Sequence, residues 1–131
     1  MTLLTGAAFQ GKLAYLRNVL KVPEEDIFFC RADDFSLDWS KKAICGLHLY
    51  VKAALAAGLD PIEQLALQPA CFSDRYLLCD NIGGGIVPLT AEDRLWRETN
   101  GRVLQYLARK ADSVWEFVCG FAVLLKGDPP C

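Results

Sequence analysis

A segment bounded by two glycines, Gly6-Ala7-Ala8-Phe9-Gln10-Gly11-Lys12-Leu13, has the spacing of a phosphate-binding loop. The glycines allow the backbone to wrap closely around a phosphate, so that main-chain N–H groups and a helix amino terminus face the anion. Lys12 then reaches the terminal phosphates as a point charge. The chemistry predicted for this segment is the binding of a nucleotide polyphosphate.

The residue after Lys12 departs from the usual pattern of such loops. A Ser or Thr normally stands there and ligates Mg²⁺ through its hydroxyl, whereas this chain has Leu13. The loop is therefore expected to hold an anion without supplying its own magnesium ligand. The alternative interpretation is a strand-to-helix turn whose glycines serve only geometry, with Lys12 as a solvated charge.

The sequence patterns on either side of the loop predict the fold that holds the loop in place. Residues 1–4 form an apolar run typical of a strand, and residues 13–20 form an amphipathic run typical of a helix. Strand-like and helix-like segments then alternate along the chain, which indicates a parallel α/β sheet. We therefore expect a single domain over residues 1–131, a three-layer P-loop (RecA-like) α/β domain with a mostly parallel sheet and a C-terminal strand pair.

Several local signals define the remaining elements. Strands are predicted at residues 27–30, 43–46, 75–79, 114–120 and 121–126, and a helix at 47–57 that ends at Gly58. Asp60 before Pro61 predicts one helix start, and a capping box at Thr90 predicts the start of the longest helix. The apolar stripe of this last helix comprises Leu95, Thr99, Val103, Leu107 and Ala111. Gly101 lies in the same helix and costs it about 1 kcal/mol relative to Ala, so a packing or ligand-related reason for it is expected.

Bulk composition excludes several classes of protein. The chain has 131 residues, 53% of them hydrophobic, and a net charge of −2 with acids and bases interspersed. The absence of a basic stripe argues against a nucleic-acid partner. No apolar run is long enough to span a bilayer, and no signal-peptide pattern is present, so a cytoplasmic protein is expected.

The six cysteines favour structural roles over a metal centre. No pair has the C-x-x-C spacing of a zinc site, and His48 is the single histidine. Four cysteines lie in apolar strand-like runs, where Cys behaves as a small hydrophobe; they are Cys30, Cys45, Cys79 and Cys119. Reduced structural thiols are therefore expected, with no bound metal.

Taken together, these segments resemble the bifunctional cobinamide kinase/cobinamide-phosphate guanylyltransferase family. The family's loop is of the Gly-Gly-Ala-Arg-Ser-Gly-Lys-Ser type, and its Asn-Glu-Val-Gly-Met-Gly-Ile-Val-Pro segment is similar to residues 80–88 here. Gly101-Arg102 matches the family's Gly-Arg helix, and residues 111–126 repeat its closing order of elements. Residues 45–50 give a weaker match to the family's Asp-Cys-Leu-Thr-Leu-Trp. Together with the segments before and after them, they extend the resemblance over most of the chain.

The resemblance implies a function and a second group of site residues. It implies ATP or GTP as the nucleotide, cobinamide as the acceptor of a phosphoryl group in cobalamin biosynthesis, and a homo-oligomer. It also favours a substrate or ligand loop that contains Asp80, Gly83, Gly84 and Gly85, with Arg102 on the following helix. The alternative for the three glycines is a flexible turn that leads into the next proline.

The departures from the family pattern fall on the chemistry. Leu13 replaces the hydroxyl, Cys45 replaces a strand-end acid that would assist the metal, and Asp80-Asn81 replaces Asn-Glu. The histidine that accepts the guanylyl group has no counterpart, and His48 aligns with a Thr, so it is interpreted as a packed or capping residue. We therefore expect weakened or altered kinase activity and loss of guanylyl transfer. We also expect poor Mg²⁺ binding, because the usual protein ligands for the ion are missing. The acids that could replace the missing metal ligand are Asp33, Asp34 and Asp80.

Two other functions remain compatible with these residues. The missing hydroxyl, acid and histidine favour a non-catalytic remnant that acts as a regulatory or structural subunit. The short segment between Cys30 and Ala43 favours a P-loop kinase of another small molecule, because the acceptor pocket would differ.

Overall fold

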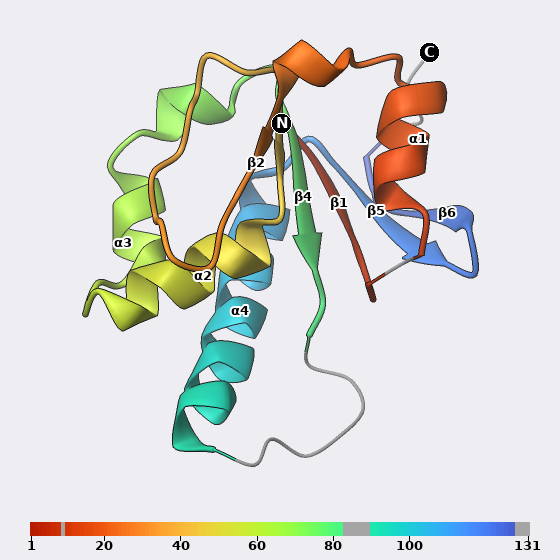
Figure 1. Ribbon diagram of the computed structural model, residues 1–131. Coiled ribbons are helices and arrows are strands. Elements are labelled where there is room, and N and C mark those ends of the chain that lie inside the picture. Colours follow the sequence, from red (N-terminus) through yellow and green to blue (C-terminus); the bar gives the residue numbers. More distant parts are fainter. Residues whose placement is uncertain (9, 83–89, 128–131) are drawn as a thin grey trace.

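The computed structural model describes residues 1–8, 10–82 and 90–127, and it contains a six-stranded sheet (Figure 1). The strand order is β2-β3-β4-β1-β5-β6, in which β6 runs antiparallel to β5 and the other paired strands are parallel. The strands are β1 (Thr2–Gly6), β2 (Ile27–Phe29), β3 (Ala43–Cys45), β4 (Tyr76–Asp80), β5 (Ser113–Val118) and β6 (Phe121–Lys126). The predicted mostly parallel sheet with a C-terminal strand pair is confirmed.

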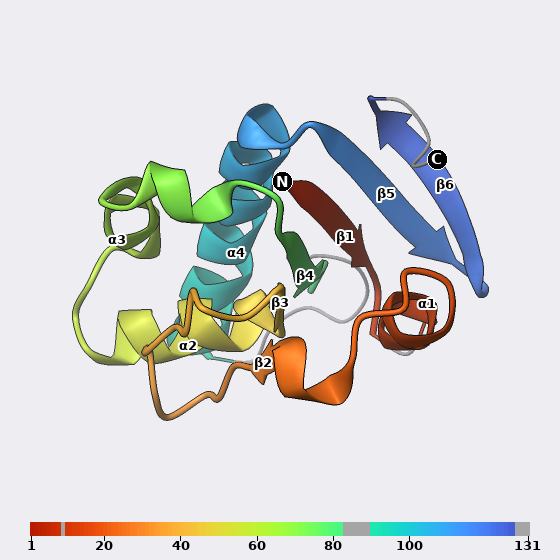
Figure 2. The same ribbon diagram turned by 90° about the horizontal axis from the view of Figure 1, so that it is seen from above.

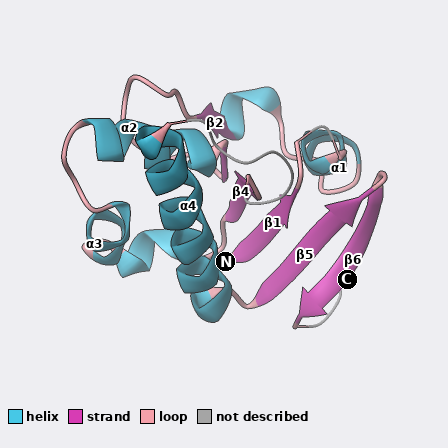
Figure 3. Ribbon diagram, turned by 90° about the horizontal axis from the view of Figure 1, so that it is seen from below, coloured by secondary structure: helices cyan, strands magenta, loops and turns pink. Residues whose placement is uncertain are grey.

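Helices cover both faces of the sheet and complete a three-layer fold. Figures 2 and 3 show α1 on one face and α2, α3 and α4 on the other. The α-helices are α1 (Lys12–Asn18), α2 (Leu47–Ala56), α3 (Pro61–Ala66) and α4 (Ala91–Lys110), and short 3₁₀ helices occupy Glu24–Asp26 and Pro69–Phe72. Within the described residues, none of these helices has the length and apolarity needed to cross a membrane.

The central strand β1 is buried on both faces and links two hydrophobic cores. Leu3 is 1% exposed and belongs to the core beneath α2 and α4, where it joins Val51 and Leu107. Leu4 is fully buried in the core beneath α1, where it joins Leu16. Successive side chains of a strand point to opposite faces, so β1 is fixed from both sides and its carboxyl end has a defined position.

The connections on either side of β1 create a crevice at the carboxyl edge of the sheet. The chain leaves β1 through α1 toward β2, whereas it leaves the neighbouring β4 through α4 toward β5 on the far side of β1. Adjacent strands whose connections diverge in this way leave a crevice beyond their carboxyl ends, where α/β proteins bind ligands. The backbone N–H of Asn81 donates to the carbonyl of Gly6 at 2.8 Å and holds these two strand ends together.

The predicted helix starts are confirmed, but the predicted stripe of α4 is partly wrong. Asp60 accepts a hydrogen bond from Ile62 N, and Thr90 accepts one from Asp93 N. Leu95, expected on the buried face of α4, is 46% exposed, because the first turns of α4 extend past the carboxyl edge of the sheet (Figure 1). The rest of the stripe is buried: Thr99, Val103, Leu107 and Ala111.

Two further local expectations are corrected. A Cβ atom added to Gly101 would meet nothing within 4 Å, so the packing reason expected for this glycine is wrong, whereas the ligand-related reason stays a prediction. Cys119 is exposed in the turn between β5 and β6, at a positive φ of 52°, and is not a buried strand residue.

The buried cysteines match the expected structural thiols. The five described cysteines are all free. Burial raises the pKa of Cys30 to about 12 and, more strongly, that of the fully buried Cys79, so both thiols are protonated at neutral pH. Cys131 lies outside the described residues.

Candidate phosphate-binding site

The predicted order of strand, glycine loop and helix is present at residues 2–18. Strand β1 ends at Gly6 and α1 begins at Lys12. Gly6 has a φ of 126°, and a Cβ atom at this position would lie 2.5 Å from the carbonyl oxygen of Phe117 on β5. Gly11 has a φ of 97° immediately before the helix. Both glycines therefore have conformations that L side chains rarely adopt, and Gly6 also has no room for a side chain.

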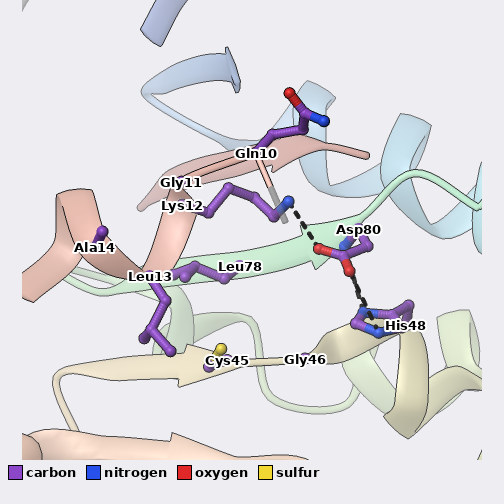
Figure 4. A pocket seen from close by; sticks show the side chains of 10 residues that line it. All are labelled: Gln10, Gly11, Lys12, Leu13, Ala14, Cys45, Gly46, His48, Leu78 and Asp80. Atoms are coloured by element: carbon purple, nitrogen blue, oxygen red, sulfur yellow. Dashed lines mark hydrogen bonds and ion pairs between the residues drawn. The ribbon is translucent and has the colours of Figure 1, made fainter. Parts of the chain in front are cut away.

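Lys12 is not the solvated charge of the alternative interpretation. The residue is only 6% exposed, and its ammonium group donates to the carbonyl oxygens of Gly6 at 3.3 Å and Ala7 at 2.6 Å. It also forms an ion pair with Asp80, with 2.8 Å between Nζ and Oδ1 (Figure 4). A buried cation requires such partners, and these lie on two adjacent strand ends.

His48 contacts the same carboxylate from the first turn of α2. Its Nε2 lies 3.6 Å from Oδ2 of Asp80, and its Nδ1 accepts a hydrogen bond from the backbone N–H of Asp80 at 3.3 Å. Because Nδ1 is an acceptor, the neutral imidazole carries its proton on Nε2, facing the carboxylate. Burial lowers the pKa of His48, and the Asp80 charge opposes that shift. Sequence reasoning placed His48 on an apolar helix face and missed this contact.

Helix α4 positions both Asp80 and His48 through hydrogen bonds to their carbonyl oxygens. Asn100 is 1% exposed, and its Nδ2 donates to the carbonyl of Asp80 at 2.9 Å while its Oδ1 accepts from Sγ of Cys79 at 3.5 Å. Trp96, one turn earlier, donates from Nε1 to the carbonyl of His48 at 2.7 Å. Sequence reasoning missed Asn100 as well; its signal was a polar amide directly beside the apolar stripe.

A cavity of about 410 Å³ lies between the loop and the ends of β3 and β4. Leu13 and Cys45 line it at the positions where a hydroxyl and a strand-end acid were expected. Gln10 also lines it, although its Oε1 accepts a hydrogen bond from the N–H of Cys119 in the β5–β6 turn. An acid is nonetheless present, because Asp80 faces the cavity beside Lys12. The other lining residues are Gly11, Ala14, Gly46, His48 and Leu78.

Not all predicted site residues meet at this cavity. Arg102 is exposed on α4, where its guanidinium lies 3.4 Å from Oγ1 of Thr99, and it does not line the cavity. Asp33 and Asp34 lie in an exposed loop and bond to Arg31 and Ser36 instead. Ala8 is exposed in the loop. Phe9 and residues 83–85 lie outside the described residues.

Comparison with known proteins supports the resemblance. The family model described as cobinamide kinase / cobinamide phosphate guanyltransferase matches residues 53–125, which is more than half of the chain. The chain belongs to this family. A relative from Salmonella typhimurium, the bifunctional adenosylcobalamin biosynthesis protein CobU, is 36% identical over 76 residues, which cover 56% of this chain and 42% of the relative. The alignment thus spans less than half of that protein's length.

The family match and the phosphate cavity overlap only in part. The matched segment contains β4, α4, β5 and most of β6, and with them Asp80, Trp96 and Asn100. The loop at residues 6–13 lies before it. Membership in the cobinamide kinase/guanylyltransferase family is therefore established by the second half of the chain, and the role of the loop depends on its geometry.

The contact between His48 and Asp80 predicts an NMR titration. Because His48 is the single histidine, its imidazole signal is unambiguous. We expect its midpoint below the ordinary value of about 6.5, since burial disfavours the charged ring. Asp80→Asn removes the negative charge that opposes this shift, so its midpoint should fall further. A wild-type midpoint above the ordinary value, or an upward shift in Asp80→Asn, would contradict the described contact.

Proposed function

We propose that this protein binds a purine nucleoside triphosphate, ATP or GTP, with the polyphosphate in the cavity beside Lys12. The observation that carries the proposal is the buried ammonium of Lys12 at the carboxyl edge of the sheet, between a glycine loop and the end of β4. A phosphate that enters the cavity would replace the Asp80 carboxylate as the ionic partner of the Lys12 ammonium. The backbone N–H groups that begin α1 favour an anion at the same place.

We further propose that the acceptor is cobinamide, in keeping with the family to which the chain belongs. In this reaction the acceptor's hydroxyl oxygen bonds to the γ-phosphorus, and the bond from that phosphorus to the β–γ bridging oxygen breaks. The nucleoside diphosphate leaves with the electron pair, and the hydroxyl proton passes to solvent. Phosphoryl transfer depends mainly on positioning and charge neutralisation, and Lys12 supplies a positive charge for both.

In the part of the cavity that the structure describes, Mg²⁺ would depend on Asp80 and on the nucleotide itself. Leu13 has no oxygen ligand, and Cys45 carries a thiol whose pKa burial raises to about 11, so it is not a hard oxygen donor. Among the described residues that line the cavity, Asp80 is the carboxylate available to the ion. Mg²⁺ often retains several waters and binds through phosphates and one or two carboxylates, so we propose that nucleotide binding persists while turnover is weakened.

Loss of guanylyl transfer is part of the same proposal. A histidine nucleophile needs a free ring nitrogen with a lone pair, and in neutral His48 this nitrogen is Nδ1, which already accepts from the N–H of Asp80.

The leucine and cysteine at the expected metal positions also favour a second candidate function, a subunit that binds nucleotide without turnover.

Calorimetric titration with GTP and ATP, each with and without Mg²⁺, tests the proposal directly. We expect saturable binding of at least one nucleotide, and incubation with γ-labelled nucleotide and cobinamide then separates the two candidates. A labelled cobinamide phosphate supports the kinase, whereas binding without product supports the non-catalytic subunit. Failure of both nucleotides to bind at millimolar concentration would refute nucleotide binding altogether.

A further inference from the structure

A second cavity, of about 430 Å³, lies between α2 and the first turns of α4. Its apolar walls come from Leu55 and Ala56 on α2 and from Leu95 and Trp96 on α4. Leu95 is the residue whose exposure contradicts the apolar pattern of α4, and it belongs to neither hydrophobic core. An exposed leucine beside a tryptophan in a concave surface is typical of a site for an organic ligand.

This second cavity lies next to the candidate phosphate site, because a residue in its wall is hydrogen-bonded to a residue in the wall of the phosphate cavity. Trp96, in its wall, donates a hydrogen bond to the carbonyl of His48, and the His48 ring contacts Asp80 beside Lys12. Lys52 lies one turn after His48 on α2 and lines the same cavity. Residues four apart share a helix face, so one face of α2 runs from the phosphate site into the second cavity.

Charged groups complement the apolar walls. The ammonium of Lys52 lies 4.6 Å from the centre of the Trp96 ring, and Glu92 and Asp93 supply carboxylates from the first turn of α4. Carboxylates accept hydrogen bonds from amide N–H groups, and an ammonium donates to amide carbonyls. The combination suits a bulky ligand with an apolar body and peripheral amides.

We propose that this cavity binds the body of the phosphoryl acceptor, an alcohol of the amide-rich corrinoid class, and this inference rests on the proposed function. An acceptor hydroxyl must lie about 3–3.5 Å from the reacting phosphorus, so its binding site must adjoin the phosphate site. A hydrogen bond joins Trp96 in the wall of the second cavity to His48 in the wall of the phosphate cavity, so the two cavities are neighbours. Two other cavities do not lie beside the phosphate site. Both are lined by Lys42 and Arg75, near the amino ends of β3 and β4, and so lie at the opposite edge of the sheet.

Leu95→Arg tests the acceptor site with an intact fold, because the side chain is already exposed. Cobinamide is titrated into the full chain without nucleotide and followed by its visible absorbance. We expect the Kd to rise about tenfold or more, since a charged side chain replaces an apolar contact. Leu67→Arg is the matched control, because Leu67 is 72% exposed and does not line the cavity; its Kd should stay within about twofold of wild type.

The outcomes separate this inference from the proposed nucleotide site. No cobinamide binding by the wild type at about 1 mM, or equal binding by wild type and Leu95→Arg, overturns the acceptor site even where GTP binds normally. Cobinamide binding that depends on Leu95 in a chain that binds no nucleotide supports the acceptor site and refutes the nucleotide proposal. The circular dichroism spectrum of Leu95→Arg should match that of wild type, which shows that the variant is folded whether or not the chain binds nucleotide.

Discussion

Lys12→Met is expected to weaken binding of GTP or ATP about 100-fold, because it removes the charge proposed to hold the terminal phosphates. Methionine retains much of the buried aliphatic chain, which limits the loss of packing around a residue that is 6% exposed. The substitution also leaves Asp80 without its cationic partner, so the carboxylate then repels the incoming phosphates. Calorimetric titration measures the change, and circular dichroism verifies the fold.

Lys110→Met provides the matched control for this variant. Lys110 ends α4 at the opposite edge of the sheet, is exposed, and lies 5.9 Å from the centre of the Tyr106 ring. Its replacement removes the same charge from the chain without touching the cavity, so nucleotide affinity should remain at the wild-type value. Equal affinity in Lys12→Met and wild type would show that the buried ammonium has a structural role only.

Gly6→Ala is expected to lower the free energy of unfolding by about 3 kcal/mol or more. The backbone at this position has a φ of 126°, and the new Cβ would lie 2.5 Å from the carbonyl oxygen of Phe117. Relief of this contact requires β1 and β5 to separate at the place where the loop begins. Urea denaturation followed by circular dichroism measures the loss, and nucleotide affinity should fall with it.

Gly101→Ala is the control for Gly6→Ala, because the same substitution is made where a side chain has room. Gly101 lies inside α4, and an added Cβ would find open space. Alanine should therefore raise the free energy of unfolding by about 1 kcal/mol through helix propensity alone. Equal effects of the two substitutions would mean that the close approach of β1 and β5 is not as described.

The sequence by itself determined the order of the elements and the position of the loop. These features depend on local signals: the glycines that flank the loop, the caps at Asp60 and Thr90, and the alternation of strand-like and helix-like runs. Each signal acts within a few residues, so it is readable without knowledge of the tertiary contacts. The family resemblance, also read from sequence, is confirmed by the match over residues 53–125.

Only the tertiary structure decided which side chains meet at the site. Lys12 and Asp80 are 68 positions apart in sequence, and they pair because β4 lies beside β1 in the sheet. The same strand order brings His48 from α2 and Asn100 from α4 to the Asp80 segment, and the overhang of α4 leaves Leu95 exposed. Strand order and helix overhang arise from contacts between distant segments, which periodicity and capping signals within one segment do not encode.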